Sequence, residues 1–131
     1  MIYLLDVNAL VALGFLNHEF HGRVVRWLQS SGSAQLASCP ITELGFVRVL
    51  SQTAAYGFTV AQARILLLRL KRVGVAPLAF IPDSHDVSHL PAWVKAPKQI
   101  TDGHLSQLAA AHGAVLATLD ENIVGSYLIP R

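Results

Sequence analysis

Two short apolar runs that each end at an aspartate constrain the fold of this chain most. Ile2–Leu5 is followed by Asp6. Val115–Leu119 is followed by Asp120. Apolar runs of this length are typical of strands that are buried on both faces. Helical patterns separate such runs, and strands that alternate with helices predict a parallel sheet covered by helices. The expected fold class is therefore α/β, with a mainly parallel central sheet.

Hydrophobic periodicity and capping residues predict the other elements along the chain. We expect strands at Ile2–Leu5, Gln35–Cys39, Leu78–Ile81 and Val115–Leu119, and an edge strand at Tyr127–Ile129. We expect helices at Asn8–Leu16, Glu19–Ser30, Pro40–Gln52 and Val60–Val73, and a last helix that is capped by Thr101 or Asp102 and runs to Ala111 or His112. Between Asp83 and Gln99 we expect a short helix and a loop.

The composition is that of one globular domain. The chain has 131 residues, 53% of them hydrophobic, so residues 1–131 are expected to form a single domain and a disordered chain is excluded. The only cysteine, Cys39, excludes a disulfide framework and fits a cytoplasmic location. The N-terminus does not resemble a signal peptide, and no apolar stretch is long enough to span a membrane. The excess of hydrophobic residues is therefore expected in the core and in a protein interface.

The carboxylates are few, eight in all, so the position of each is informative. Asp6 and Asp120 follow predicted strands, and ligands of parallel sheets bind beyond the carboxyl ends of the strands. Asp102 begins the helix that precedes the late strand, so it can lie near the same edge of the sheet. Taken singly, each of these acids is explained more simply as a helix N-cap or first-turn residue.

Glu43 is harder to explain as a surface acid. It shares one stripe of its predicted helix with Phe46 and Leu50, three and seven residues further on. A carboxylate on a core-facing stripe is costly unless it is paired or bound to a cation. The alternative is a first-turn acid whose carboxylate reaches outward to water.

Several carboxylates in one cleft raise each other's pKa by repulsion, and a hard divalent cation removes that cost. Mg²⁺ and Mn²⁺ prefer oxygen ligands and keep water molecules that can meet a phosphate. Such a site supports the hydrolysis of phosphodiester bonds. The four acids Asp6, Glu43, Asp102 and Asp120 are therefore candidate metal ligands and catalytic residues.

The order of these acids resembles that in the PIN-domain ribonucleases. The four segments that carry the resemblance are Tyr3-Leu4-Leu5-Asp6-Val7-Asn8, Cys39-Pro40-Ile41-Thr42-Glu43, Thr101-Asp102-Gly103-His104-Leu105 and Ala117-Thr118-Leu119-Asp120. Their spacing and the length of the chain are similar to those of the small VapC-type toxins of bacterial toxin–antitoxin pairs. The resemblance covers essentially the whole chain.

The resemblance implies a three-layer α/β/α fold and an Mg²⁺- or Mn²⁺-dependent endoribonuclease that hydrolyses RNA. It assigns the four acids to one metal site and gives Asn8, Thr101 and Thr118 supporting hydrogen bonds. It also implies a homodimer and a cognate antitoxin that inserts a peptide into a groove of the toxin. The family often has a basic residue after the last acid. Here Glu121 and Asn122 follow, which leaves open whether either one joins the metal site.

The basic residues of the predicted helix Val60–Val73 are candidates for steering RNA toward the acids. They are Arg64, Arg69, Lys71 and Arg72. The net charge of +2 does not by itself imply a nucleic-acid partner, and the alternative for these residues is a solvated helix face. The same helix is apolar on more than one side, so one side is expected to meet the sheet and another a partner.

Other functions fit these residues less well than a nuclease. A haloacid-dehalogenase-like phosphatase also places an aspartate after the first strand, but it requires a second acid where this chain has Asn8. A zinc site at His85 and His89 lacks an evident third ligand. Two alternatives stay open: a PIN nuclease that processes RNA without being a toxin, and a catalytically degenerate module that binds a partner.

Overall fold

The computed structural model describes residues 1–32, 34–74 and 77–131. The strands found there are β1 (Ile2–Leu5), β2 (Gln35–Ser38), β3 (Leu78–Phe80), β4 (Ala114–Thr118) and β5 (Tyr127–Leu128). They form one sheet in the order β3-β2-β1-β4-β5, and every neighbouring pair is parallel. The prediction of a mainly parallel sheet is confirmed, and all carboxyl ends of the strands lie at one edge.

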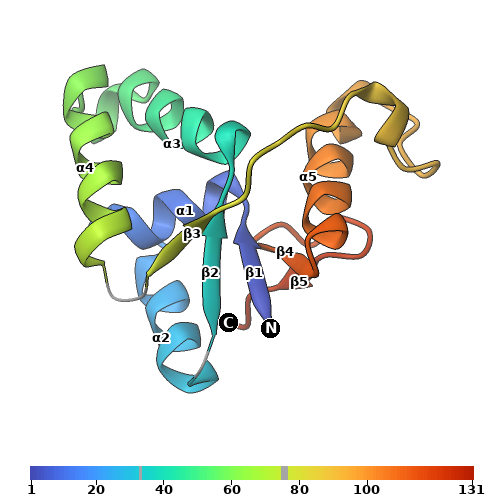
Figure 1. Cartoon of the computed structure of the whole chain (residues 1–131). Coiled ribbons are helices and arrows are strands. Elements are labelled where there is room, and N and C mark those ends of the chain that lie inside the picture. Colours follow the sequence, from blue (N-terminus) through green and yellow to red (C-terminus); the bar gives the residue numbers. More distant parts are fainter. Residues whose placement is uncertain (33, 75–76) are drawn as a thin grey trace.

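Helices cover both faces of this sheet (Figure 1). They are α1 (Val7–Gly14), α2 (His21–Ser31), α3 (Pro40–Gln52), α4 (Val60–Val73) and α5 (Ile100–Ala111). The first four pack over one face, and α5 packs over the other against β4. The expected three-layer α/β/α architecture is confirmed. Among the described residues, no helix has both the length and the apolar character needed to cross a membrane.

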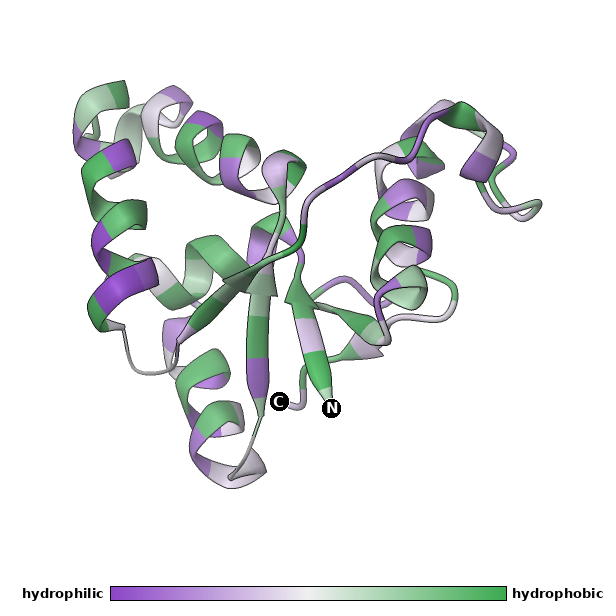
Figure 2. Ribbon diagram, in the orientation of Figure 1, coloured by the Kyte–Doolittle hydropathy of each residue, from purple (hydrophilic) through white to green (hydrophobic). Residues whose placement is uncertain are grey.

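The strands supply side chains to two separate cores. Leu5 packs into the core beneath α1 to α4, whereas its neighbour Leu4 packs into the core beneath α5. Leu36 and Ala37 divide in the same way, because successive side chains of a strand point to opposite faces. This explains why the strands read as continuous apolar runs, and Figure 2 shows them mostly in the hydrophobic colours.

The predicted starts of three helices were wrong, and local hydrogen bonds explain two of them. Several strand limits and the ends of α1 and α2 also differ from the predicted ones by one or two residues. Helix α1 begins at Val7, since the Asp6 carboxylate caps it. Helix α2 begins at His21 rather than Glu19, since a turn across residues 18–20 precedes it. Helix α5 begins at Ile100, so Thr101 and Asp102 lie in its first turn and do not cap it. The preceding segment contains two 3-10 turns, Val87–His89 and Pro97–Gln99, where a short helix and a loop were expected.

Close contact between α3 and α1 fixes the edge of the sheet where the strands end. A Cβ atom added at Gly45 of α3 would lie only 2.5 Å from Val7 Cγ2, the residue after Asp6. Glycine therefore allows the two helices to approach at the start of α1. This approach helps to set the position of the first aspartate of the site.

Candidate active site

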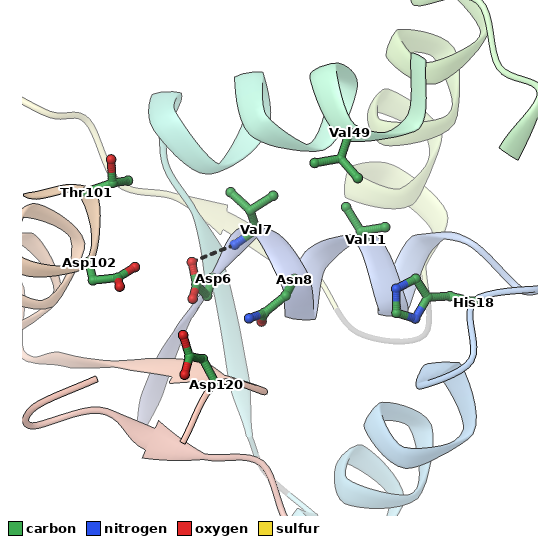
Figure 3. Close-up of a pocket in the computed structure, with 9 residues that line it drawn as sticks. All are labelled: Asp6, Val7, Asn8, Val11, His18, Val49, Thr101, Asp102 and Asp120. Carbon is green, nitrogen blue, oxygen red and sulfur yellow. Dashed lines mark hydrogen bonds between the residues drawn. The ribbon is translucent and has the colours of Figure 1, made fainter. Parts of the chain in front are cut away.

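The carboxyl edge of the sheet opens into a cleft of about 400 Å³ that three aspartates line. Asp6 follows β1, Asp120 follows β4, and Asp102 projects from the first turn of α5 (Figure 3). These three side chains come from segments far apart in the sequence and point toward one another. Asn8 and Thr101, which the resemblance associated with these acids, also line the cleft.

Asp6 is held rigidly at the floor of the cleft. It is only 7% exposed, its Oδ1 accepts a hydrogen bond from the Val7 backbone N–H at 2.8 Å, and its Oδ2 accepts one from the Thr118 hydroxyl at 2.8 Å. Both carboxylate oxygens thus have fixed partners. A carboxylate whose orientation is set in this way needs little rearrangement to bind a cation.

The Thr118 hydroxyl joins the polar side chains of the cleft into one network. Besides donating to Asp6, its Oγ1 accepts hydrogen bonds from the Asp120 backbone N–H at 3.0 Å and from Asn8 Nδ2 at 3.2 Å. Asn8 Oδ1 in turn accepts from the Leu119 N–H at 3.1 Å. Thr118 is fully buried, so its hydroxyl has no contact with solvent and forms its hydrogen bonds only with these groups.

Two of the three aspartates, Asp6 and Asp102, have a raised pKa. Burial raises the pKa of the Asp6 carboxyl and the charge of Asp120 adds to this, while the hydrogen bonds from Thr118 and Val7 oppose it. Burial also raises the pKa of Asp102, and the charges of Asp6 and Asp120 raise it further. The folded protein therefore favours protonated carboxyls here or a cation that neutralises them. The donor chemistry of the set, which is carboxylate oxygen, is the kind that Mg²⁺ and Mn²⁺ prefer.

Replacing Asp102 by asparagine is expected to stabilise the protein when no divalent metal is present. Because the pKa of Asp102 is raised on folding, its ionised form disfavours the folded state at pH 7. The penalty disappears below about pH 4, where the unfolded-state carboxyl is protonated too. Asp102→Asn should therefore raise Tm at pH 7, and the gain should shrink as the pH falls toward 4. Each 1 kcal/mol corresponds to roughly 2–8 °C in chains of this size range.

The measurement is thermal unfolding in EDTA across that pH range. Glu121→Gln serves as the control, since it removes a carboxylate that pairs with Arg131 on the surface and is not among the residues lining the cleft. A lower Tm for Asp102→Asn at pH 7 would show that the ionised Asp102 carboxylate does not destabilise the folded protein.

Glu43 does not line the cleft. It lies in the first turn of α3, and its Oε2 accepts from the Ser38 hydroxyl at 2.6 Å and lies 2.7 Å from Lys71 Nζ. The Lys71 ammonium also sits 5.0 Å from the Phe80 ring centroid. The Lys71 ammonium thus compensates for the desolvation of the Glu43 carboxylate. To bind a metal ion in the cleft, Glu43 would have to give up this ion pair.

The basic residues of α4 separate into two kinds. Arg64, Arg69 and Arg72 are exposed, and within the described part of the chain they form no ion pair. Lys71 is instead half-buried and bound to Glu43. The three arginines are accessible to solvent, as a role in steering RNA requires, whereas Lys71 forms an ion pair within the protein.

Several polar residues close to the cleft in sequence do not line it. Neither Glu121 nor Asn122 lines the cleft, although the Asn122 backbone N–H donates to Asp120 Oδ1 at 2.9 Å. His104 pairs with a different acid, since its Nε2 lies 2.5 Å from Asp83 Oδ2. In residues 1–32, 34–74 and 77–131, no three side chains of His, Cys, Asp or Glu stand close enough together to hold a metal ion in the arrangement described.

The far end of the cleft contains residues that the sequence did not single out. Beyond Asn8 the walls are formed by Val11 and Val49, and the imidazole of His18 closes that end (Figure 3). No sequence signal marks His18 as part of the site, because it lies in a turn 12 residues after Asp6. Only the reversal of the chain between α1 and α2 returns it to the cleft.

Comparison with known proteins identifies clear relatives. Residues 3–124 match the PIN domain family. The chain is 38% identical to ribonuclease VapC38 of Mycobacterium tuberculosis over 92% of this chain and 86% of that protein. It is 34% identical to ribonuclease VapC39 of the same organism over 96% of this chain and 94% of that protein.

The fold is similar to that of a solved structure. The match is VapC20 of Mycobacterium tuberculosis, a toxin that cleaves the sarcin–ricin loop, with a TM-score of 0.59 over 94% of this chain and 92% of that one. The sequences are 11% identical, so this likeness concerns the fold.

Proposed function

The chain belongs to the VapC group of the PIN-domain family, and we propose that it is a metal-dependent endoribonuclease that acts as the toxin of a toxin–antitoxin pair. The observation that carries the proposal is the convergence of Asp6, Asp102 and Asp120 on one cleft at the carboxyl edge of the sheet. The relatives are named ribonucleases, and this cleft supplies the acidic groups that such chemistry needs.

The three aspartates would hold Mg²⁺ or Mn²⁺ by drawing closer together around the ion, because as they lie in the described residues they are too far apart to share one. When bound, the metal supplies a Lewis acid that polarises a phosphoryl oxygen and lowers the pKa of an attacking water. Thr118 and the Val7 N–H hold the Asp6 carboxylate in a fixed orientation. Asn8 anchors the turn that carries Asp120, through the Leu119 N–H. These contacts reduce the rearrangement needed when RNA binds.

Glu43 is the fourth acid of the proposed site, in a more distant role. Its first-turn position on α3 puts it at the same edge of the sheet as the aspartates, and Lys71 and Ser38 already neutralise and orient it. We propose that it contributes to the metal site when its pairing with Lys71 is exchanged.

Removal of metal is the direct test of this function. Purified protein incubated with a mixture of tRNA and ribosomal RNA should cut it in Mg²⁺ or Mn²⁺. EDTA should slow cleavage by at least about 100-fold, and excess Mg²⁺ should restore it, since the metal both activates water and neutralises the acids. The readout is the appearance of new RNA ends on denaturing gels. Cleavage that persists unchanged in EDTA would contradict a metal mechanism, and the absence of any cleavage would favour the degenerate partner-binding module.

The proposed partners follow from the family and fit the surface of α3 and α4. We propose a cytoplasmic antitoxin protein that inserts a peptide into a groove of the toxin, and a homodimer of this chain. A second cavity of about 480 Å³ lies between these helices, with Leu44, Val60 and Leu68 along it. These three side chains are at least half exposed, which supports an apolar protein contact there. A chain without an antitoxin would instead be an RNA-processing nuclease with the same chemistry.

A further inference from the structure

His18 lies in the same cleft as the aspartates, at the opposite end (Figure 3). Its Nδ1 accepts a hydrogen bond from the Phe20 backbone N–H at 3.1 Å, within the turn that delays the start of α2. An imidazole nitrogen that accepts a hydrogen bond carries no hydrogen. In the neutral ring the hydrogen is therefore on Nε2, and the ring has one fixed orientation.

Aromatic side chains support the ring of His18. The ring centroid of Phe20 lies 5.8 Å from that of His18, and the ring of Tyr56 lies 6.3 Å away. Phe15 in turn packs edge-on against Tyr56 at 4.9 Å. His18 is thus the cleft-lining member of an aromatic cluster, and its ring is held in place from two directions.

The ionisation of His18 suits a flat neutral surface rather than a counter-ion. Burial lowers the pKa of its imidazole, and the neighbouring charge of Glu19 only partly offsets this. At neutral pH the ring is therefore mostly uncharged. An uncharged imidazole adds little attraction for phosphate, but it offers an aromatic face and one N–H donor.

The two ends of the cleft match the two parts of a nucleotide. One end holds three carboxylates that can engage a phosphate through a cation, and the other combines apolar walls with an aromatic ring. Proteins that bind single-stranded nucleic acid use aromatic side chains as surfaces on which bases stack. The cleft volume of about 400 Å³ is within the range of small-ligand sites.

We propose that His18 is a base-stacking residue, and that a base next to the scissile phosphate stacks on its ring when RNA lies in the cleft. This inference rests on the proposed nuclease function and deepens it, since it predicts that the substrate presents an unpaired base at the cut site. A base within an intact duplex is stacked on its neighbours and cannot reach the ring.

Two probes of equal charge separate base stacking from phosphate attraction. The first is fluorescein-labelled octa-adenylate, and the second is a labelled octamer of abasic ribose phosphates. Binding is measured by fluorescence anisotropy in Mg²⁺ with the Asp6→Asn protein, so that neither probe is cut. The same measurement is made with His18→Ala, His18→Phe and His89→Ala added to that protein. His89 serves as the matched control because it is not among the residues lining the cleft.

We expect octa-adenylate to bind about five- to 150-fold more tightly than the abasic octamer, the range for one stacked base. His18→Ala should remove most of that difference, His18→Phe should keep it because the ring is retained, and His89→Ala should not change it. Circular dichroism checks that each variant is folded. Equal binding of the two probes, failure to bind either one, or a difference that survives His18→Ala would overturn the inference.

Cleavage of RNA by the unmodified protein in Mg²⁺, measured in parallel, separates the two proposals. Cleavage without a difference in binding between the two probes would support the nuclease function and contradict the stacking role of His18. Discrimination without cleavage would keep the base-binding site and remove the nuclease.

Discussion

Asp6→Asn is expected to abolish RNA cleavage and to leave the fold intact. Asp6 lies on the floor of the cleft between two other acids and is the most buried carboxylate of the described residues. Asparagine has nearly the same shape and can still accept a hydrogen bond from the Val7 N–H. It lacks the charge that attracts a divalent cation. The loss should exceed about 100-fold, the largest effect usual for an outer partner of a metal ligand.

The measurement is the initial rate of cleavage of one RNA in Mg²⁺, with Tm recorded on the same samples. Glu121→Gln is the matched control, since it removes one carboxylate from the surface pair with Arg131 and is expected to cut at the normal rate. The role of Asp6 would have to be abandoned if Asp6→Asn cleaved RNA as fast as the unmodified protein.

Thr118→Val is expected to weaken both the site and the fold. Valine has nearly the same shape as threonine but lacks the hydroxyl that contacts Asp6, Asp120 and Asn8. Those groups would then lose a partner in a buried place, at a cost of about 1–3 kcal/mol in the free energy of unfolding. Loss of such support around metal ligands usually lowers metal affinity or activity by about 10- to 100-fold.

Thr118→Ser distinguishes the contribution of the hydroxyl from that of the methyl group. Serine retains the hydroxyl and loses only a methyl group, so cleavage should stay within a few-fold of normal while stability falls slightly. The concentration of Mg²⁺ that gives half-maximal cleavage should rise in Thr118→Val and remain near normal in Thr118→Ser. Equal Mg²⁺ dependence in the two variants would show that the hydroxyl network does not organise the acids.

Local signals allowed two helices, α3 and α4, to be predicted closely. Helix α3 runs over Pro40–Gln52 and α4 over Val60–Val73, as expected. Proline suits the first position of a helix, and Thr59 caps α4 by accepting a hydrogen bond from the Gln62 N–H at 3.1 Å. Where the start of a helix depends on a turn that precedes it, as at His21 and Ile100, the prediction was wrong by two or three residues.

Positions on the strands predicted part of the candidate site. Because parallel strands end at one edge, the acids after β1 and β4 had to open onto the same crevice, and the structure places Asp6 and Asp120 there. The sequence could not predict how far Glu43 lies from them. Its partner Lys71 is 28 residues away along the chain, and only the packing of α4 against α3 joins the two.

The sequence by itself determined the layered fold and which aspartates follow the ends of the strands. Strand-length apolar runs, helix signals between them and the residue types that end the strands are local properties, so they can be read without coordinates. Only the tertiary structure decided which groups share the cleft, because burial, pairing and ring packing depend on contacts between distant segments. That is why Thr118 emerges as the centre of the network, why Glu43 is bound by a lysine, and why His18 closes the far end of the cleft.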